Sequence, residues 1–329
     1  MNPPPLLHVE DVVKSFGEVH AVAGVSFEVR RGEIFGFLGP NGAGKTTTLR
    51  MVMGITRPDR GAIRFGDGKA IDRRHVGYLP EERGLYEAAA ALDILVYLGT
   101  LRGMTRADAR TAGRRWLERL ELADRAKDKV QTLSKGNQQK VQFAGAVLHR
   151  PALVVLDEPF AGLDPLNQEV FLSVIAELRD QGAAVLISAN HLDLVERACD
   201  RFLLIARGRG ILGGTLDEMR QAVARGAAEI LSLSLRPRDG ASAAEASALL
   251  DPVAAGLERR VSPGAEGTIE VEIALPAARD LAPILTALGG RFAVERVHMR
   301  PLPLHEVYLR AVRAERKPGA AEAREVARA

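Results

Sequence analysis

Residues 34–54 read IFGFLGPNGAGKTTTLRMVMG, and this stretch decides the fold class of the chain. Its first five residues are apolar and predict a buried strand, and the residues from Lys45 onward predict a helix that ends at Gly54. Between them, GPNGAGKT at residues 39–46 fills every required position of the phosphate-loop pattern G-x-x-x-x-G-K-[ST]. The alternative is a glycine-rich turn that merely starts a helix, and the flanking strand and helix disfavour it.

The spacing of this motif suits the binding of a nucleoside triphosphate. Glycines let the loop curl so that successive backbone N–H groups point at phosphate oxygens, and the following helix adds its unpaired N–H groups. We expect the Lys45 ammonium to reach the β- and γ-phosphates and the Thr46 hydroxyl to bind Mg²⁺. The loop residues expected to contact ATP are Gly39, Pro40, Asn41, Gly42, Ala43, Gly44, Lys45, Thr46 and Thr47.

A second apolar strand is predicted at residues 152–157, and two acidic residues, Asp157 and Glu158, stand at its end. Ligands of open α/β sheets bind at the carboxyl ends of the strands, so Asp157 is a candidate Mg²⁺ ligand opposite Thr46. Glu158 is a candidate general base that activates the attacking water. Two adjacent acids in a solvated loop are the alternative, which the complete phosphate loop disfavours.

The segment LSKGNQQK at residues 133–140 lies upstream of that strand and resembles the signature sequence of ATP-binding-cassette (ABC) ATPases, in its LSKGxQQ variant. Other features follow in the order of that family. AGLD at residues 161–164 resembles the D-loop, and SANH, which ends at His191, resembles the segment that carries the switch histidine. Phe16 stands where the family places an aromatic ring that stacks on adenine. The resemblance covers about residues 5–220.

The resemblance implies an α/β fold, a P-loop NTPase of the ABC type, with a RecA-like core and a helical subdomain at about residues 82–150. Two cassettes of this family associate head to tail, and each ATP lies between one phosphate loop and the partner's signature segment. His191 would contact the γ-phosphate and the attacking water, and it is a catalytic candidate beside Glu158. The remaining residues implied to contact ATP are Asp164 and, acting on the opposite subunit's ATP, Ser134, Lys135, Gly136 and Asn137.

Three positions depart from the commoner pattern of the family, and one of them is Asn137, which replaces the glutamine of the signature. Glu81, in VGYLPEERGLY at residues 76–86, stands where most cassettes carry a Gln. Its carboxylate is a third candidate Mg²⁺ ligand, although it adds negative charge near the triphosphate. Lys135 replaces a glycine of the signature. Either it adds positive charge near the γ-phosphate, or it is a solvent-facing lysine at a turn.

Composition excludes several classes of protein. With 329 residues, 47% of them hydrophobic and 26% charged, the chain is neither disordered nor collagen-like. No apolar run approaches the about 20 residues that a membrane helix needs. The net charge is only +3 and basic residues are interleaved with acidic ones, which gives little support to nucleic-acid binding. The single cysteine, Cys199, rules out an internal disulfide and fits a reducing cytosol.

We expect an ABC ATPase domain at residues 5–222, a small C-terminal α+β accessory domain at 226–314 and a flexible tail at 315–329. A regulatory module, a dimer-supporting module and a docking surface for a permease all remain open for the accessory domain. The elements predicted after the phosphate loop are helical structure over about residues 87–126, a helix at 170–181, a strand at 183–188, strands at 229–235 and 268–275, and helices at 241–250, 277–288 and 304–314.

The leading hypothesis is the ATP-hydrolysing subunit of a membrane exporter. Within the family, the chain resembles bacterial ABC-2-type export ATPases, including the sodium-extruding kind, through residues 32–48, residues 76–86 and the segment LPLHEVYLR at 302–310. This resemblance implies a homodimer of cassettes that uses ATP and Mg²⁺, makes no direct contact with nucleic acid, and lies in the cytoplasm, held on the inner face of the membrane by separately encoded permease subunits. The alternative is a soluble cassette protein that acts on ribosomes or nucleic acid, although such proteins usually carry two cassettes or a basic arm.

Overall fold

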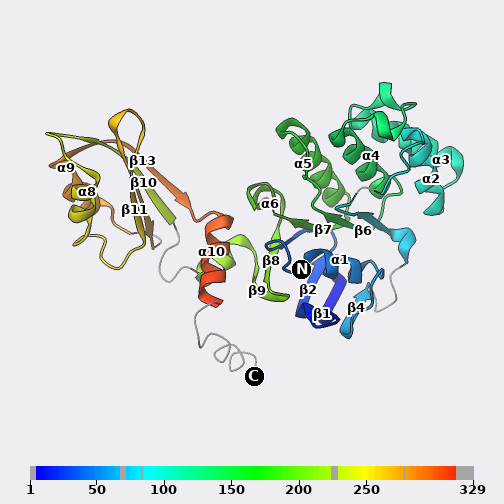
Figure 1. Cartoon of the computed structure of the whole chain (residues 1–329), viewed down its shortest axis with the longest axis horizontal. Coiled ribbons are helices and arrows are strands. Elements are labelled where there is room, and N and C mark those ends of the chain that lie inside the picture. The colour runs from blue at the N-terminus through cyan, green and yellow to red at the C-terminus, as the bar shows by residue number, and fades with distance from the viewer. Residues whose placement is uncertain are drawn as a thin grey trace. The chain divides into compact units, whose positions relative to one another are not determined.

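The computed structural model describes residues 5–66, 72–82, 84–190, 192–223, 229–276 and 279–315. The chain divides into two compact units, Met1–Leu216 and Asp217–Ala329, whose elements are labelled in Figure 1. Among the described residues, no helix is both long enough and apolar enough to cross a bilayer. The predicted tail beyond residue 315 lies outside the described residues.

The centre of the first unit is a six-stranded sheet with the order β5-β6-β7-β3-β8-β9. The strands from β5 to β8 are parallel, and β9 runs antiparallel to β8. Every residue of β3, β6 and β7 is buried, which explains why the sequence shows continuous apolar runs there. Because β3, β6 and β7 are parallel, their carboxyl ends meet at one edge of the sheet. The strands are β3 (Ile34–Leu38), β5 (Val76–Leu79), β6 (Leu153–Asp157), β7 (Ala184–Ala189), β8 (Arg201–Ala206) and β9 (Arg209–Gly214).

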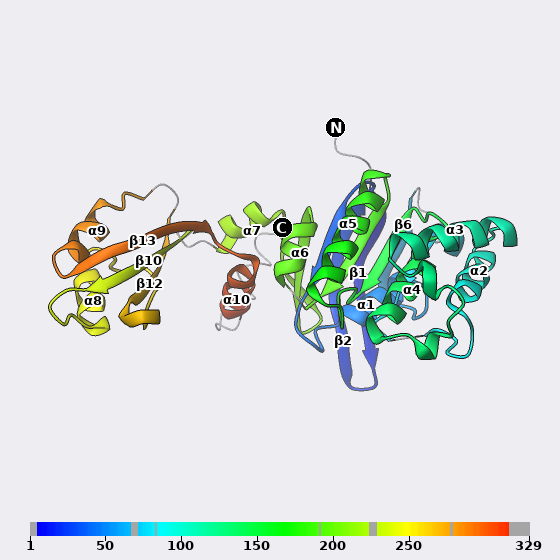
Figure 2. The same cartoon turned by 90° about the horizontal axis from the view of Figure 1, so that it is seen from above.

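An antiparallel sheet of β1 (Pro5–Phe16), β2 (Val19–Arg30) and β4 (Arg60–Phe65) completes the core of this unit. Figure 2 shows β1 and β2 as a long two-stranded ribbon. Phe27 of β2 packs against Phe35 and Phe37 of β3, with ring centroids 5.4 and 5.2 Å apart. Leu49 and Val52 of α1 (Lys45–Val52) belong to the same apolar cluster, so this core fixes the helix that follows the phosphate loop.

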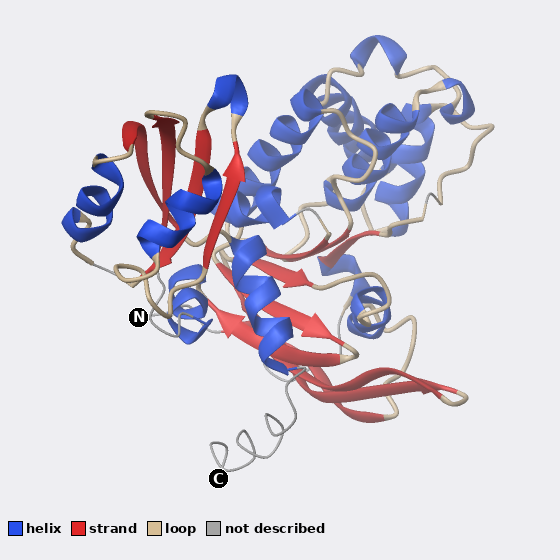
Figure 3. Cartoon of the chain, turned by 60° about the vertical axis from the view of Figure 1, so that its left-hand side comes forward, coloured by secondary structure: helices blue, strands red, loops and turns tan. Residues whose placement is uncertain are grey.

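A helical region, drawn in blue and apart from the strands in Figure 3, contains α2 (Ala91–Leu101), α3 (Arg106–Arg119) and α4 (Lys135–Val147). The helical structure expected over residues 87–126 is broken after α2, because Gly103 has φ +89° and Thr105 then caps a new helix through Asp108 N–H. Phe143 of α4 is fully buried and its ring lies 6.3 Å from Trp116 of α3.

Two further α-helices of the first unit, α5 and α6, follow β6 and β7. The helix expected at residues 170–181 begins earlier, as α5 (Pro165–Asp180), because the Asp164 carboxylate caps it and proline is favourable at the first helical position. Its Phe171 ring packs against that of Phe143 in a tilted arrangement, with the centroids 4.5 Å apart. The other helical segments of this unit are α6 (Leu192–Ala198) and the short turns Arg73–His75, Ala123–Arg125 and Val130–Thr132.

From β10 to β13 the second unit has the order β-α-β-β-α-β, which is the ferredoxin-like split βαβ arrangement, and α7 and α10 stand before and after it. Its antiparallel sheet has the order β11-β12-β10-β13, and α8 and α9 cover one face through a core that includes Leu233, Val271, Leu250 and Ile284. The expected strands and helices are present, except that the helix expected at 277–288 begins at Ala282, with residues 277 and 278 outside the described residues. The strands β11 and β13 were not predicted. The elements are α7 (Leu216–Val223), β10 (Glu229–Pro237), α8 (Ala243–Leu250), β11 (Arg259–Pro263), β12 (Ile269–Leu275), α9 (Ala282–Gly289), β13 (Phe292–Pro301), α10 (Leu304–Glu315) and a short turn at Ala265–Gly267.

Candidate active site

The phosphate loop leaves β3 at the carboxyl edge of the central sheet and enters α1 at Lys45. Gly44 has φ +102°, a conformation that favours glycine, and a Cβ atom there would lie 2.4 Å from the Ala21 carbonyl oxygen. A Cβ atom on Gly39 would lie 2.4 Å from the Ile205 carbonyl oxygen. These close approaches explain two of the glycines of the motif, because neighbouring backbone leaves no room for a side chain.

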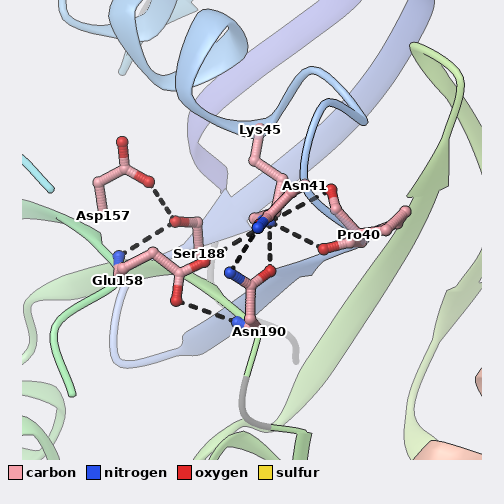
Figure 4. Close-up of polar contacts among 8 residues, drawn as sticks. Pro40, Asn41, Lys45, Asp157, Glu158, Ser188 and Asn190 are labelled. Carbon is pink, nitrogen blue, oxygen red and sulfur yellow. Dashed lines mark hydrogen bonds and ion pairs between the residues drawn. The ribbon is translucent and has the colours of Figure 1, made fainter. Parts of the chain in front are cut away.

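Lys45 lies inside this loop with only 6% of its surface exposed. Its Nζ donates to the Gly39 carbonyl at 2.8 Å and to Asn190 Oδ1 at 2.7 Å, and it forms an ion pair with Glu158 Oε1 at 3.5 Å (Figure 4). Nζ also donates to the Pro40 carbonyl at 3.5 Å. The positive charge that the motif predicts is therefore held over the loop, next to the acidic residue that ends the second strand.

Asp157 is the last residue of β6 and is fully buried. One of its oxygens, Oδ1, accepts a hydrogen bond from the Ser188 hydroxyl of β7, with which Asp157 is paired in the sheet. The other, Oδ2, is buried and has no hydrogen-bond partner among the described residues. A buried carboxylate oxygen without a donor suits a metal ion, so the donor set of Asp157 and the half-buried Thr46 fits Mg²⁺.

Glu158 follows Asp157 in a strained backbone conformation, with φ +51°. Its side chain turns back toward Lys45, and its Oε2 accepts a hydrogen bond from the Asn190 backbone N–H at 3.0 Å. Burial raises the pKa of Glu158, and the attraction of Lys45 only partly offsets this effect. A carboxylate with a raised pKa accepts a proton more readily, which suits a general base.

The predicted adenine partner, Phe16, ends β1 with 54% of its surface exposed. Lys14 Nζ lies 5.5 Å from the centroid of its ring. Phe16 pairs with Val19 at the turn into β2, and Ala21 of that strand borders Gly44. The exposed ring therefore stands on the hairpin that borders the phosphate loop.

The predicted Mg²⁺ ligand Glu81 is exposed just beyond β5. None of the hydrogen bonds or ion pairs of the described residues joins it to Asp157 or Lys45. The adjacent Glu82 forms an ion pair with Arg50 of α1 at 3.7 Å. The role of Glu81 as a metal ligand stays a prediction.

The signature residues stand at the start of α4. The Ser134 hydroxyl caps this helix by accepting a hydrogen bond from the Asn137 N–H at 3.3 Å. Ser134 and Lys135 are exposed, and Gly136 is half-buried. None of the described polar contacts of Lys45, Asp157 and Glu158 involves these residues, and their action on the ATP of another subunit stays a prediction.

Two further site residues were predicted, Asp164 and His191. Asp164 caps α5 by accepting hydrogen bonds from Asn167, and these bonds lower the pKa of Asp164. Its predicted contact with ATP stays a prediction. His191, the predicted switch histidine, lies outside the described residues.

Ser188 and Asn190 belong to the site, and the sequence analysis did not single them out. Both come from the end of the strand predicted at residues 183–188, at the same sheet edge as Asp157. The rule that ligands bind at the carboxyl ends of parallel strands was therefore the available signal.

Comparisons with known proteins find similarity to one family. The family model described as ABC transporter matches residues 22–161. The ABC transporter ATP-binding protein YhaQ of Bacillus subtilis (strain 168) is 41% identical over 220 residues, which cover 66% of this chain and 74% of that protein. The Nod factor export ATP-binding protein I of Burkholderia lata is 33% identical over 306 residues, 91% of this chain and 94% of that protein. A solved structure of the ATP binding subunit of an ABC transporter has a TM-score of 0.62 and 34% identity over 66% of this chain and 92% of its own.

Proposed function

The chain belongs to the ATP-binding subunits of ABC transporters, and we propose that it is the ATPase that drives an ABC-2-type exporter. As a cassette of this family it is an ATPase. The export assignment is supported chiefly by the Nod factor export relative, whose similarity is long enough to include both units of the chain. The permease would be a separately encoded membrane protein that holds the chain on the cytoplasmic face.

In this proposal the phosphate loop binds the triphosphate of ATP. Lys45 donates to the β- and γ-phosphate oxygens, and the backbone N–H groups at the start of α1 surround them. Thr46 and Asp157 hold Mg²⁺, which when bound neutralises charge on those oxygens. Ser188 supports this role because its hydrogen bond occupies one oxygen of Asp157 and leaves the other for the metal.

Glu158 is the proposed general base. It takes a proton from a water molecule as the water oxygen bonds to the γ-phosphorus, and the bond from that phosphorus to the β-phosphate oxygen breaks. ADP and inorganic phosphate are the products. The raised pKa of Glu158 and its fixed position beside Lys45 support this assignment.

The proposed working unit is a head-to-tail pair of chains. The exposed Ser134 and the N–H groups at the start of α4 are available to grip the γ-phosphate of an ATP bound to a second copy. ATP would then hold the two cassettes together, and its hydrolysis would release them. This cycle is what would move the attached permease between its states.

Replacing Glu158 by Gln tests the catalytic part of the proposal. We expect Glu158→Gln to bind ATP and to release phosphate about 10²–10⁴-fold more slowly than the wild type, because the amide cannot accept the proton. Phosphate release by the full chain with Mg²⁺ and ATP measures this rate. Undiminished turnover in the variant would show that Glu158 is not the base.

A further inference from the structure

Asn190 directly follows β7 and makes three hydrogen bonds to the site (Figure 4). Its backbone N–H donates to Glu158 Oε2 at 3.0 Å. Its side-chain Nδ2 donates to Asn41 Oδ1 in the phosphate loop at 3.0 Å, and its Oδ1 accepts from Lys45 Nζ at 2.7 Å. This one residue therefore connects the loop, the lysine and the proposed base.

The orientation of the Asn190 carboxamide follows from its two partners. The Lys45 ammonium can only donate, so the carboxamide atom that faces it must be the oxygen. The nitrogen then faces Asn41, whose side-chain oxygen accepts the bond. The two contacts are satisfied together in this orientation only, so the side chain fastens Lys45 to its own loop.

A phosphate oxygen that binds Lys45 needs one of the ammonium donors, and Asn190 accepts from one of them. An ammonium has three donors. Lys45 Nζ donates to Asn190 Oδ1 at 2.7 Å, to the Gly39 carbonyl at 2.8 Å and to the Pro40 carbonyl at 3.5 Å, and it lies 3.5 Å from Glu158 Oε1 in an ion pair. A phosphate oxygen must displace one of these acceptors. The Gly39 and Pro40 carbonyls belong to the backbone of the loop, and Glu158 is buried and charged. Asn190 is exposed and neutral, so its side chain is the acceptor that can rotate into water.

We propose that the Asn190 side chain is a positioning residue that holds Lys45 and Asn41 in the absence of nucleotide and is displaced when phosphate oxygens bind. The proposal rests on the proposed ATP-binding function of the same loop. Hydrogen bonds that exist only in the nucleotide-free chain oppose ATP binding, because they must be broken first. The backbone N–H of Asn190 remains with Glu158 throughout, so the base keeps its support.

Two substitutions of Asn190 separate this role from a structural one, because the expected effects have opposite signs. Asn190→Ala removes both side-chain bonds, so we expect ATP to bind about threefold to tenfold more tightly. Asn190→Asp gives Lys45 a charged acceptor and places a negative charge beside the triphosphate, so we expect ATP to bind about tenfold more weakly. Calorimetric titration of the full chain with ATP in EDTA, where hydrolysis is blocked, measures both affinities.

Thermal unfolding without nucleotide gives a second readout. Asn190→Ala should melt below the wild type, and Asn190→Asp should melt above Asn190→Ala because its carboxylate restores the contact with Lys45. Asn190→Ser, whose side chain is too short to reach Lys45, repeats the alanine test with a polar side chain. Agreement of Ser with Ala in both readouts supports the proposal, and a Ser variant that behaves like the wild type contradicts it.

The titrations also distinguish failure of this inference from failure of the proposed function. If the wild type does not bind ATP, or if Lys45→Ala binds it equally well, the proposed function itself fails. If the wild type binds ATP through Lys45, then unchanged or weaker binding by Asn190→Ala overturns the role of Asn190 alone. Equal weakening by the alanine and aspartate variants would have the same consequence.

Discussion

Ser188 is fully buried at the end of β7, and its hydroxyl is the only described hydrogen-bond partner of the Asp157 side chain. The Ser188 hydroxyl donates to Oδ1 of Asp157, and Oδ2 has no donor among the described residues. The proposed Mg²⁺ site therefore depends on a residue that does not contact the metal, as is common for residues that orient metal ligands.

Replacing Ser188 by Ala should weaken Mg²⁺ binding by about tenfold or more, because Asp157 loses the hydrogen bond that orients it. The Mg²⁺ concentration that gives half-maximal ATPase activity of the full chain measures this change. ATP binding in EDTA is the control and should stay within about twofold of the wild type. An unchanged Mg²⁺ requirement would contradict the orienting role of Ser188.

The two parts of the site differed in how well the sequence predicted them. The phosphate loop and the acidic pair at 157–158 were predicted because each is a continuous motif whose spacing carries its chemistry. Ser188 and Asn190 were not, since their bonds span 31 residues to Asp157 and 149 residues to Asn41. The parallel pairing of β6 with β7 sets Asp157 opposite Ser188. The pairing of β3 with β7 sets Leu38, just before the phosphate loop, opposite Ala189, just before Asn190.

At the scale of elements, Gln142 links the proposed ATP site to the helical region. This residue of α4 donates its amide N–H to the carbonyl oxygens of Pro80, at 3.3 Å, and Glu82, at 3.1 Å. Glu82 in turn pairs with Arg50 of α1. The helix that begins at the signature segment is thus tied to the helix that begins at the phosphate loop.

His149, just beyond α4, gives this part of the fold a predicted sensitivity to acid. Its Nε2 bonds to the Val76 carbonyl of β5 at 3.3 Å, while its buried Nδ1 has no partner among the described residues. Burial, with repulsion from Arg102, lowers the pKa of His149 from 6.5 to about 4. Between pH 6.5 and about pH 4, His149 is protonated in the unfolded chain and neutral in the folded chain. The free energy of unfolding therefore falls as the pH falls through this range.

We expect His149→Gln to remove part of this pH dependence, because glutamine keeps a donor for Val76 but does not titrate. The half-buried position reduces the effect, and we expect the wild type to lose about 1–2 kcal/mol more than the variant between pH 7 and pH 4.5. Urea unfolding at both pH values measures the difference. Equal losses in the two proteins would contradict the lowered pKa of His149.

The elements themselves were predictable where one face or both faces are buried. β6, β7, β10 and β12 have strong apolar patterns and lie close to their predicted positions. β13 escaped prediction because it is an edge strand whose central residues 295–298 are exposed, so burial imposes no alternation there. The break between α2 and α3 was missed because it depends on the left-handed conformation of Gly103.

At the scale of the whole molecule, the proposed ATP-driven pairing of two chains can be tested at Ser134. Aspartate caps a helix as well as serine does, so Ser134→Asp should preserve the start of α4 while placing a negative charge against the γ-phosphate of the second subunit's ATP. We expect Glu158→Gln to sediment as a dimer with Mg²⁺ and ATP, and the double variant Glu158→Gln with Ser134→Asp to remain monomeric. A double variant that still dimerises would contradict the proposed composite site.

The ferredoxin-like arrangement of the second unit does not by itself indicate a function, because this fold supports many. The similarity to the Nod factor export ATP-binding protein I covers 306 residues and extends beyond the length of the first unit, so we propose the exporter role for the chain with both units present.

The exporter assignment is tested most directly by the distribution of the full chain between soluble and membrane fractions. The chain is expressed alone or together with each multi-span membrane protein that a neighbouring gene encodes, and the sedimented membranes are assayed for the chain. We expect the chain alone to stay in the soluble fraction and to move to the membranes when its permease is present. A chain that remains soluble with that permease in the membrane would contradict the assignment.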